Sequence, residues 1–162
     1  MQATRLTLIC HAVTPLQKHG RFPDDESVAM DWQGAALSLA GRFKKTMRLV
    51  SAPEARSRQT AGLFGADAQI ENALRDVDFG AWKGQAIDQL APDALAAWMT
   101  DSAAAPHGGE SVEQLCTRVG HWIKSLESHP GHVVAVTHPF VIRAALLYVM
   151  QFPLSKFYLI DV

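Results

Sequence analysis

In Leu8-Ile9-Cys10-His11-Ala12-Val13-Thr14-Pro15, a histidine follows an apolar run of strand length and precedes an irregular loop. The carboxyl ends of the strands form the ligand crevice of an open parallel sheet, so we expect a titratable side chain at this position to face a pocket. The stretch Val133 to Thr137 has the same form, because it leads into His138 and Pro139 and then into an apolar helix. The sequence therefore predicts two histidines at equivalent strand ends.

Strand and helix patterns alternate along most of the chain. Short apolar runs predict strands at Leu6 to Cys10, Met47 to Val50, Val133 to Val136 and Phe157 to Ile160, with loops and brief strands between Ala68 and Gln85. Apolar residues at helical spacing predict helices from Asp31 to about Phe43, from Pro53 to the Leu63-Phe64-Gly65 stretch, from the Ser111 and Gln114 capping box to Leu126, and from Phe140 to Met150. This alternation predicts an α/β fold, a three-layer sandwich in which a mostly parallel sheet has helices on both faces.

The composition indicates a single domain over residues 1–162. Of the 162 residues 48% are apolar and 19% are charged, which suits one globular unit with a substantial core. The net charge of −1 provides no attraction to nucleic acid or to an anionic membrane, so the expected partner is a small molecule. Cys10 and Cys116 form no ligand cluster, and we expect no secretory or membrane-spanning segment, which makes the cytoplasm the expected compartment. The sequence leaves open whether the chain forms a homodimer.

Arg56 is predicted in the first turn of the helix that follows the second strand. The positive end of the helix dipole disfavours a cation there by about 0.3–1 kcal/mol. An anion at the same helix end would offset this, because backbone N–H groups and a guanidinium can share its oxygens. A solvated surface arginine is the alternative reading of Arg56, and it is the expected state of Arg58.

Five segments in order, spread over nearly the whole chain, carry recognisable motifs. The first is Cys10-His11-Ala12-Val13-Thr14, followed by Gln17 and Gly20-Arg21. The others are Ser51 through Ala61 with Arg56 and Gln59-Thr60-Ala61, Leu74-Arg75-Asp76-Val77-Asp78-Phe79-Gly80-Ala81-Trp82-Lys83-Gly84, Gly108-Gly109-Glu110-Ser111, and Val136-Thr137-His138. Together they resemble the histidine phosphatases related to cofactor-dependent phosphoglycerate mutase, whose first signature is Arg-His-Gly.

The resemblance implies a phosphatase that works through a covalent intermediate. His11 would attack a phosphomonoester and become a phosphohistidine, which water later hydrolyses. Arg56 and His138 would hold the phosphoryl oxygens, and Asp76 would donate a proton to the leaving alkoxide, with Asp78 as the competing candidate. Substrate-binding roles are expected for Thr14, Gln17, Arg21 and Thr137. The expected ligand is a small phosphorylated substrate or inorganic phosphate, and no cofactor or metal is required.

The chain departs from the family pattern at three motif positions. Cys10 replaces the arginine before the nucleophile, and loss of such a donor typically costs about 2.7–4 kcal/mol, or roughly 10²–10³ in rate. The cations that remain are Arg56, His138 when protonated, and Arg21 if it moves in from the long loop. Ala12 replaces a glycine and adds a methyl group at the strand end. Asp76 replaces a glutamate, which shortens the reach of the carboxyl group by one methylene.

Two classes of function follow from this pattern. The first is a phosphomonoester hydrolase of small metabolites that works through phosphorylated His11, with activity reduced by the change at Cys10. The second is a catalytically impaired member that binds a phosphorylated ligand or a protein partner without turnover. A mutase role fits less well, because mutases of the family use extra insertions to retain a bisphosphate. A phosphatase of cofactor biosynthesis, acting on a nucleotide-loop precursor, stays open.

Two other interpretations of the site residues are disfavoured, and the remaining histidines are expected outside the site. Cys10 does not fit a thiol phosphatase, because the sixth residue after it is Leu16 where the phosphate loop of such an enzyme needs an arginine. A metal site made by His11 and His138 lacks the local ligand spacing of known sites. The remaining histidines match no site motif and are expected in solvated or loop positions: His19, His107, His121, His129 and His132.

Overall fold

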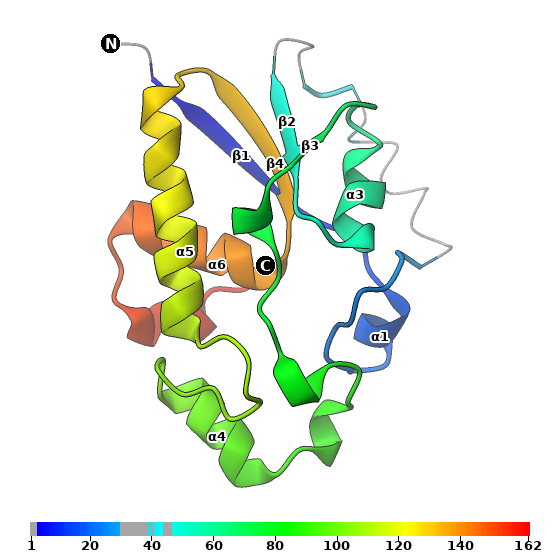
Figure 1. Cartoon of the computed structure of the whole chain (residues 1–162), viewed down its shortest axis with the longest axis vertical. Helices are drawn as coiled ribbons and strands as arrows, with labels where there is room; N and C mark the ends of the chain where they lie inside the picture. The colour runs from blue at the N-terminus through cyan, green and yellow to red at the C-terminus, as the bar shows by residue number, and fades with distance from the viewer. Residues whose placement is uncertain (1–2, 30–38, 40, 44–46) are drawn as a thin grey trace.

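The centre of the molecule is a four-stranded sheet with the strand order β1-β4-β2-β3 (Figure 1). The computed structural model describes residues 3–29, 39, 41–43 and 47–162. Within them every pairing between named strands is parallel. The strands are β1 (Arg5–Cys10), β2 (Arg48–Ser51), β3 (Gln69–Ile70) and β4 (His132–Thr137). The predicted α/β fold with a largely parallel sheet is confirmed.

Helices connect the strands and cover both faces of the sheet. The α-helices are α1 (Pro15–Lys18), α3 (Ala55–Ala61), α4 (Pro92–Thr100), α5 (Val112–Ser125) and α6 (Pro139–Met150). The 3-10 helices are η1 (Asn72–Leu74), η2 (Gly80–Trp82), η3 (Ile87–Gln89), η4 (Leu126–Ser128) and η5 (Leu154–Leu159). The helix predicted from Asp31 to Phe43 lies mostly outside the described residues.

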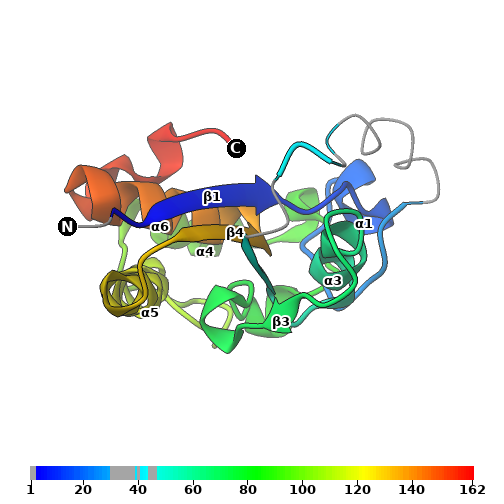
Figure 2. The ribbon, with the colours of Figure 1, turned by 90° about the horizontal axis from the view of Figure 1, so that it is seen from above.

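Alternate residues of β4 build two separate cores. Val133 and Ala135 face a large cluster formed with α5 and α6, while Val134 and Val136 face a smaller cluster that includes Ala61 of α3. Figure 2 shows the sheet from its end, with α5 and α6 on one side and α3 on the other. The period of two along the strand therefore produces the three layers that the sequence predicts.

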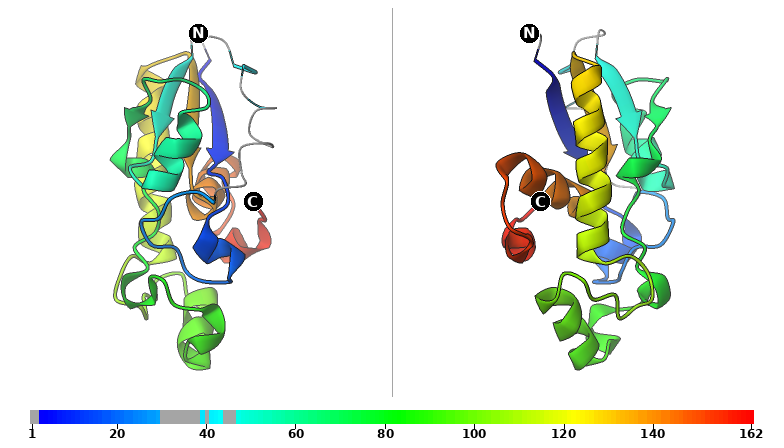
Figure 3. Two further views of the ribbon diagram at one scale, coloured as in Figure 1. Left: turned by 90° about the vertical axis from the view of Figure 1, so that its right-hand side faces the viewer. Right: turned by 60° about the vertical axis from the view of Figure 1, so that its left-hand side comes forward.

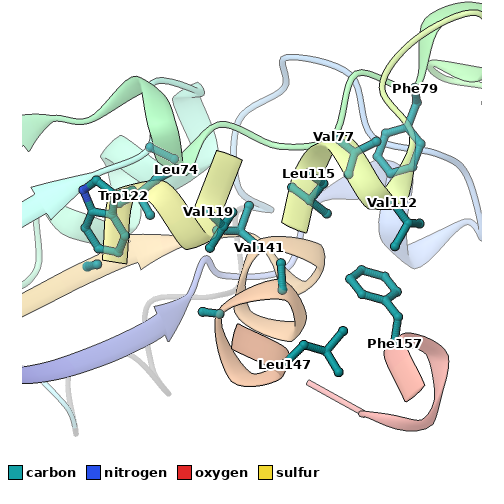
Figure 4. Packing of buried hydrophobic residues seen from close by; sticks show 14 of the residues in the cluster. Leu74, Val77, Phe79, Val112, Leu115, Val119, Trp122, Val141, Leu147 and Phe157 are labelled. Carbon is teal, nitrogen blue, oxygen red and sulfur yellow. The ribbon is translucent and has the colours of Figure 1, made fainter. Parts of the chain in front are cut away.

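The long helix α5 is the main support of the larger core. Its capping box forms as predicted, because Ser111 Oγ accepts from Gln114 N and Gln114 Oε1 accepts from Ser111 N. Leu115 and Val119 are fully buried against the sheet and α6 (Figure 4). The right-hand view of Figure 3 shows α5 lying along the sheet.

The strand predicted at Phe157 to Ile160 is wrong. The chain forms η5 there, and Phe157 is buried while Leu159 is 74% exposed. The partly or fully buried residues Leu154, Phe157 and Ile160 recur at intervals of three, which is the period of a 3-10 helix and not of a strand. Phe157 packs its ring on Phe140 of α6, and this tertiary contact sets the local structure.

The segment that runs from η2 through η3 to α4 lies beyond the carboxyl ends of the strands, beside α1. It projects below the sheet in Figure 1. Two of its loops cross closely. Ala81 N donates to His107 O, and Glu110 N donates to Asp78 O. A Cβ on Gly109 would lie 1.8 Å from Asp78 O, so only glycine fits at the crossing. These contacts place the residues near Asp78 over the carboxyl end of the sheet.

Candidate active site

The two histidines at the strand ends lie side by side. Cys10 and Thr137 pair in register as the last residues of β1 and β4, and His11 N donates to Thr137 O. The rings of His11 and His138 are 5.1 Å apart between centroids at an interplanar angle of 61°. Both side chains are buried, His138 completely. Adjacent parallel strands thus bring together two residues from opposite ends of the sequence.

The His11 ring is neutral, and a hydrogen bond identifies the ring nitrogen that carries its proton. Its Nδ1 lies 2.8 Å from the Ala12 carbonyl oxygen, which can only accept, so Nδ1 carries the hydrogen. Burial, and after it the charge of neighbouring His138, lower the pKa of His11 from 6.5 to about 4. The lone pair of the neutral ring is therefore on Nε2, the position that a nucleophile or metal ligand uses.

We expect the His11 ring to become an imidazolium only near pH 4. Since this pKa lies below the value of 6.5 in the unfolded chain, the unfolded chain binds the proton first as the pH falls. The stabilising contribution of this ring is present above pH 6.5 and is lost as the pH falls through 4. Nuclear magnetic resonance titration of the ring, assigned with His11→Gln, measures the midpoint directly. A midpoint at pH 6 or above would contradict the burial argument.

Arg56 and Asp76 form a buried ion pair beside the two rings. Arg56 Nη2 lies 2.6 Å from Asp76 Oδ2, and Nη1 donates to Asp24 O at 2.6 Å. Arg56 is only 2% exposed although it carries a charge. Thr60 connects α3 to the loop after β1, because its Oγ1 donates to Arg56 O and accepts from Ala12 N. The alternative reading of Arg56 as a solvated surface residue is excluded.

His138 lies between two carboxylates. Its Nε2 is 2.7 Å from Glu54 Oε2, and its Nδ1 is 3.4 Å from Asp76 Oδ2. Burial alone would raise the pKa of Glu54, but the hydrogen bond and the charge of His138, aided by the Asp76 backbone N–H, lower it to about 2. Glu54 is therefore an ionised carboxylate at neutral pH, and Nε2 of His138 is the donor between them.

Two buried nitrogens around these side chains have no hydrogen-bond partner among the described residues. They are Arg56 Nε and His138 Nδ1. A buried donor without a partner is unfavourable by roughly 1–3 kcal/mol, so such groups commonly mark a place for a ligand. A cavity of about 300 Å³ opens beside the cluster; its lining includes Glu54, Arg56, Asp76, Arg75, Asp78 and Lys83 but neither His11 nor His138. The site therefore offers a ligand the orphaned Arg56 Nε–H donor and a His138 ring nitrogen with no partner among the described residues.

The chain segment just before Asp76 is held in place by Arg118. Arg118 of α5 donates through Nη1 to the carbonyl oxygens of Ala73 and Arg75, and pairs with both carboxylate oxygens of Glu110. Asp78, the competing acid candidate, is exposed and pairs with Lys83 at 2.8 Å. Geometry therefore places Asp76, and not Asp78, against Arg56 and His138.

The predicted substrate-binding side chains have structural partners. Thr14 caps α1 in a capping box with Gln17 and donates to Glu26 Oε1 at 2.6 Å. Thr137 Oγ1 donates to Leu74 O. Arg21 is exposed and donates to Gly84 O. The structure thus joins His11, Arg56, Asp76 and His138 in one cluster, while the roles of these four other residues in binding stay predictions.

Sequence reasoning missed Glu54, and it gave no sign that the loop residue His107 is buried. Glu54 is the N-cap residue of α3, two residues before Arg56, so an acidic residue between the strand end and that arginine was the available signal. His107 was expected in a solvated or loop position, and it lies in a loop, where it is 3% exposed with its ring centroid 4.5 Å from that of Trp98. A loop histidine buried by aromatic packing from other segments leaves no local sequence pattern.

A model of the histidine phosphatase superfamily (branch 1) matches residues 6–162. The chain belongs to this superfamily. It is 30% identical over 128 residues to a bifunctional protein of Mycobacterium tuberculosis. The aligned region covers 72% of this chain but only 35% of that protein. The chain is 27% identical over 178 residues to a glucosyl-3-phosphoglycerate phosphatase of Mycolicibacterium vanbaalenii, covering 96% of this chain and 78% of that one.

Solved structures of the superfamily have the same fold. A mycobacterial glucosyl-3-phosphoglycerate phosphatase in complex with VO3 superposes with a TM-score of 0.86 at 25% identity, covering 98% of this chain and 88% of that one. A phosphoserine phosphatase mutant from Entamoeba histolytica gives a TM-score of 0.87 at 18% identity, covering 98% and 86%, and supports the fold alone. Within the described residues, no helix of this superfamily member has the length and apolar character to cross a membrane.

Proposed function

We propose that the chain is a phosphomonoester hydrolase that acts on a small phosphorylated metabolite through a phosphohistidine on His11. One observation carries the proposal: neutral His11, with its lone pair on Nε2, lies beside a buried arginine and a buried histidine that each have a nitrogen with no partner among the described residues. The phosphatase names of the mycobacterial relatives support the reaction class. The cytoplasm as compartment, and small molecules in place of nucleic acid or membrane as partners, stay predictions, and a homodimer stays open.

The first step transfers the phosphoryl group to His11. Nε2 attacks phosphorus, the P–N bond forms, and the bond to the ester oxygen breaks. Arg56 Nε and His138 Nδ1 would donate to the phosphoryl oxygens, where charge gathers in the transition state. Because these groups are held in place before the substrate arrives, they need little reorganisation during the reaction.

Asp76 is the proposed acid and base. In the free site its carboxylate pairs with Arg56. When phosphoryl oxygens take over the guanidinium, Asp76 is free to hold a proton and pass it to the leaving alkoxide. In the second step the same carboxylate takes a proton from the water that attacks phosphorus, and the P–N bond breaks to release inorganic phosphate.

The test is the detection of both turnover and intermediate. The purified chain is incubated with p-nitrophenyl phosphate and a panel of sugar, glycerate and amino acid phosphomonoesters, and released phosphate is measured. A labelled substrate followed by rapid quenching is expected to leave an acid-labile phosphoenzyme. Phosphate release without any phosphoenzyme, under conditions that trap one in a related phosphatase, would refute the mechanism.

The second candidate is binding of a phosphorylated ligand or a protein partner without turnover. Cys10 favours it, because burial raises the pKa of this thiol to about 11, with the charge of Asp76 acting in the same direction, so the position holds no charge at neutral pH. The carboxylate partners of Arg56 and His138 also weaken the positive potential of the empty site. Saturable binding of inorganic phosphate with no turnover of any ester would select this candidate.

Replacement of Cys10 by arginine is expected to raise kcat/KM toward the roughly 10²-fold that one such donor typically contributes. Cys10 is the last residue of β1 and interacts electrostatically with both Asp76 and Arg56, so a guanidinium there would lie beside the phosphoryl site. Cys10→Met, which adds bulk without charge, is the control. Equal kinetics for the arginine variant and the wild type would show that another cation already fills this role.

A further inference from the structure

Glu54 is the least expected member of the site. It precedes α3 as its N-cap residue, yet its side chain makes no cap hydrogen bond. Instead Oε2 lies 2.7 Å from His138 Nε2, and Oε1 accepts from the backbone N–H of Asp76 at 2.9 Å. One carboxylate therefore contacts a phosphoryl-binding group through one oxygen and the proposed acid through the other.

The contact with Glu54 fixes which nitrogen of His138 is available to substrate. A carboxylate oxygen only accepts, so Nε2 must donate to it. The other nitrogen, Nδ1, is fully buried, has no hydrogen-bond partner among the described residues and lies 3.4 Å from Asp76 Oδ2, the oxygen that pairs with Arg56. With a hydrogen on Nδ1 as well, the ring is an imidazolium that donates to Glu54 and keeps a charged N–H for a phosphoryl oxygen.

The charge of this ring matters because the site holds few cations. Cys10 is a neutral thiol, and among the described residues Arg56 is the one guanidinium of the buried cluster. We propose that Glu54 is a positioning residue, which fixes the orientation of the His138 ring and stabilises its imidazolium form. The imidazolium then supplies the second positively charged donor of a site that has a neutral residue at position 10. This inference rests on the proposed function and identifies how the site is charged.

The charged and titratable groups that face His138 come from three other segments of the fold. Glu54 and Arg56 belong to the start of α3, Asp76 follows η1, and His11 follows β1, while Ser57 Oγ lies 3.3 Å from Nε2. Arg56 is paired with Asp76 in the free site. Glu54 is therefore the carboxylate whose negative charge is directed mainly at His138.

The experiment compares wild type with Glu54→Gln and Glu54→Asp, using the full chain. Glutamine keeps an oxygen for the Asp76 N–H but removes the charge, whereas aspartate keeps the charge with a shorter reach. Nitrogen-15 resonance of the His138 ring at pH 7 is expected to show two protonated nitrogens in wild type and one in Glu54→Gln. Exposed Glu113→Gln, on the first turn of α5, is the matched charge-loss control.

The kinetic arm uses p-nitrophenyl phosphate. Glu54→Gln is expected to lower kcat about tenfold to hundredfold, the range seen when the partner that orients a functional histidine is removed. Its activity should recover as the pH is lowered and the ring regains its proton, and Glu54→Asp should restore part of the loss at pH 7. Thermal unfolding of each variant checks that the fold is intact.

The outcomes separate this inference from the proposed function. If wild type fails to turn over any ester, the proposed function fails, and the resonance of His138 still decides whether Glu54 sets its protonation. An unchanged His138 resonance in Glu54→Gln overturns the inference. The same holds for a pH profile of Glu54→Gln that parallels wild type.

Discussion

Replacing His11 with alanine is expected to lower kcat for p-nitrophenyl phosphate by at least about 10³-fold, because the group that forms the covalent intermediate is lost. The phosphoenzyme trapped in wild type should disappear. Binding of inorganic phosphate should persist, since Arg56 and His138 keep their buried positions. Calorimetric binding of phosphate by the variant, measured beside its turnover, checks both halves of this expectation.

The control for this substitution is His129→Ala, at an exposed position after η4 and far from the strand ends in the chain. It should keep the wild-type rate and the phosphoenzyme. A variant without His11 that still forms a stable phosphoenzyme would mean that another residue is the nucleophile. A variant that keeps more than a tenth of wild-type turnover would exclude covalent catalysis through His11.

The largest structural effect is expected for Gly109→Ala. The new Cβ would lie 1.8 Å from Asp78 O and 3.0 Å from Gly80 N, and both neighbours are backbone atoms that cannot rotate away. The two loops would have to separate, which breaks the bond from Glu110 N to Asp78 O. Overpacking of this kind typically costs about 1–3 kcal/mol, and we expect the upper end of that range. For a chain of this size, the melting temperature should fall by roughly 6–12 °C.

Gly65→Ala provides the comparison. Its Cβ would meet only a side-chain carbon of Leu49, at 3.2 Å, and that side chain can shift. Its melting temperature should therefore stay much closer to wild type than that of Gly109→Ala. Equal melting temperatures for Gly109→Ala and wild type would show that the loops are not held as closely as the contacts indicate.

The strand-end pattern in the sequence predicted the sheet and the position of both histidines. Short apolar runs of strand length mark β1 and β4, and the Ser111 capping box marks α5, because these signals are local. The strand expected at Phe157 to Ile160 was wrong because a tertiary contact with Phe140 decided that segment. The local sequence pattern could not show that this tertiary contact outweighs the strand preference of the segment.

The candidate site was predictable where a motif carried it. His11, Arg56, Asp76 and His138 came from motif positions, and the fold brings them together. Glu54 has no motif signal, because its importance arises from a contact with a residue at the far end of the chain. The choice between Asp76 and Asp78 as the acid also required the structure, since both are acidic and only two positions apart.

Among the described strands, β1 pairs with β4 alone. During synthesis β1 must therefore wait, without its ladder partner, until residues 132–137 have left the ribosome. Pairings between such distant segments form late and slow folding. The candidate site is thus among the last features to form, so a nascent or truncated chain that lacks β4 has no assembled cluster of His11 and His138.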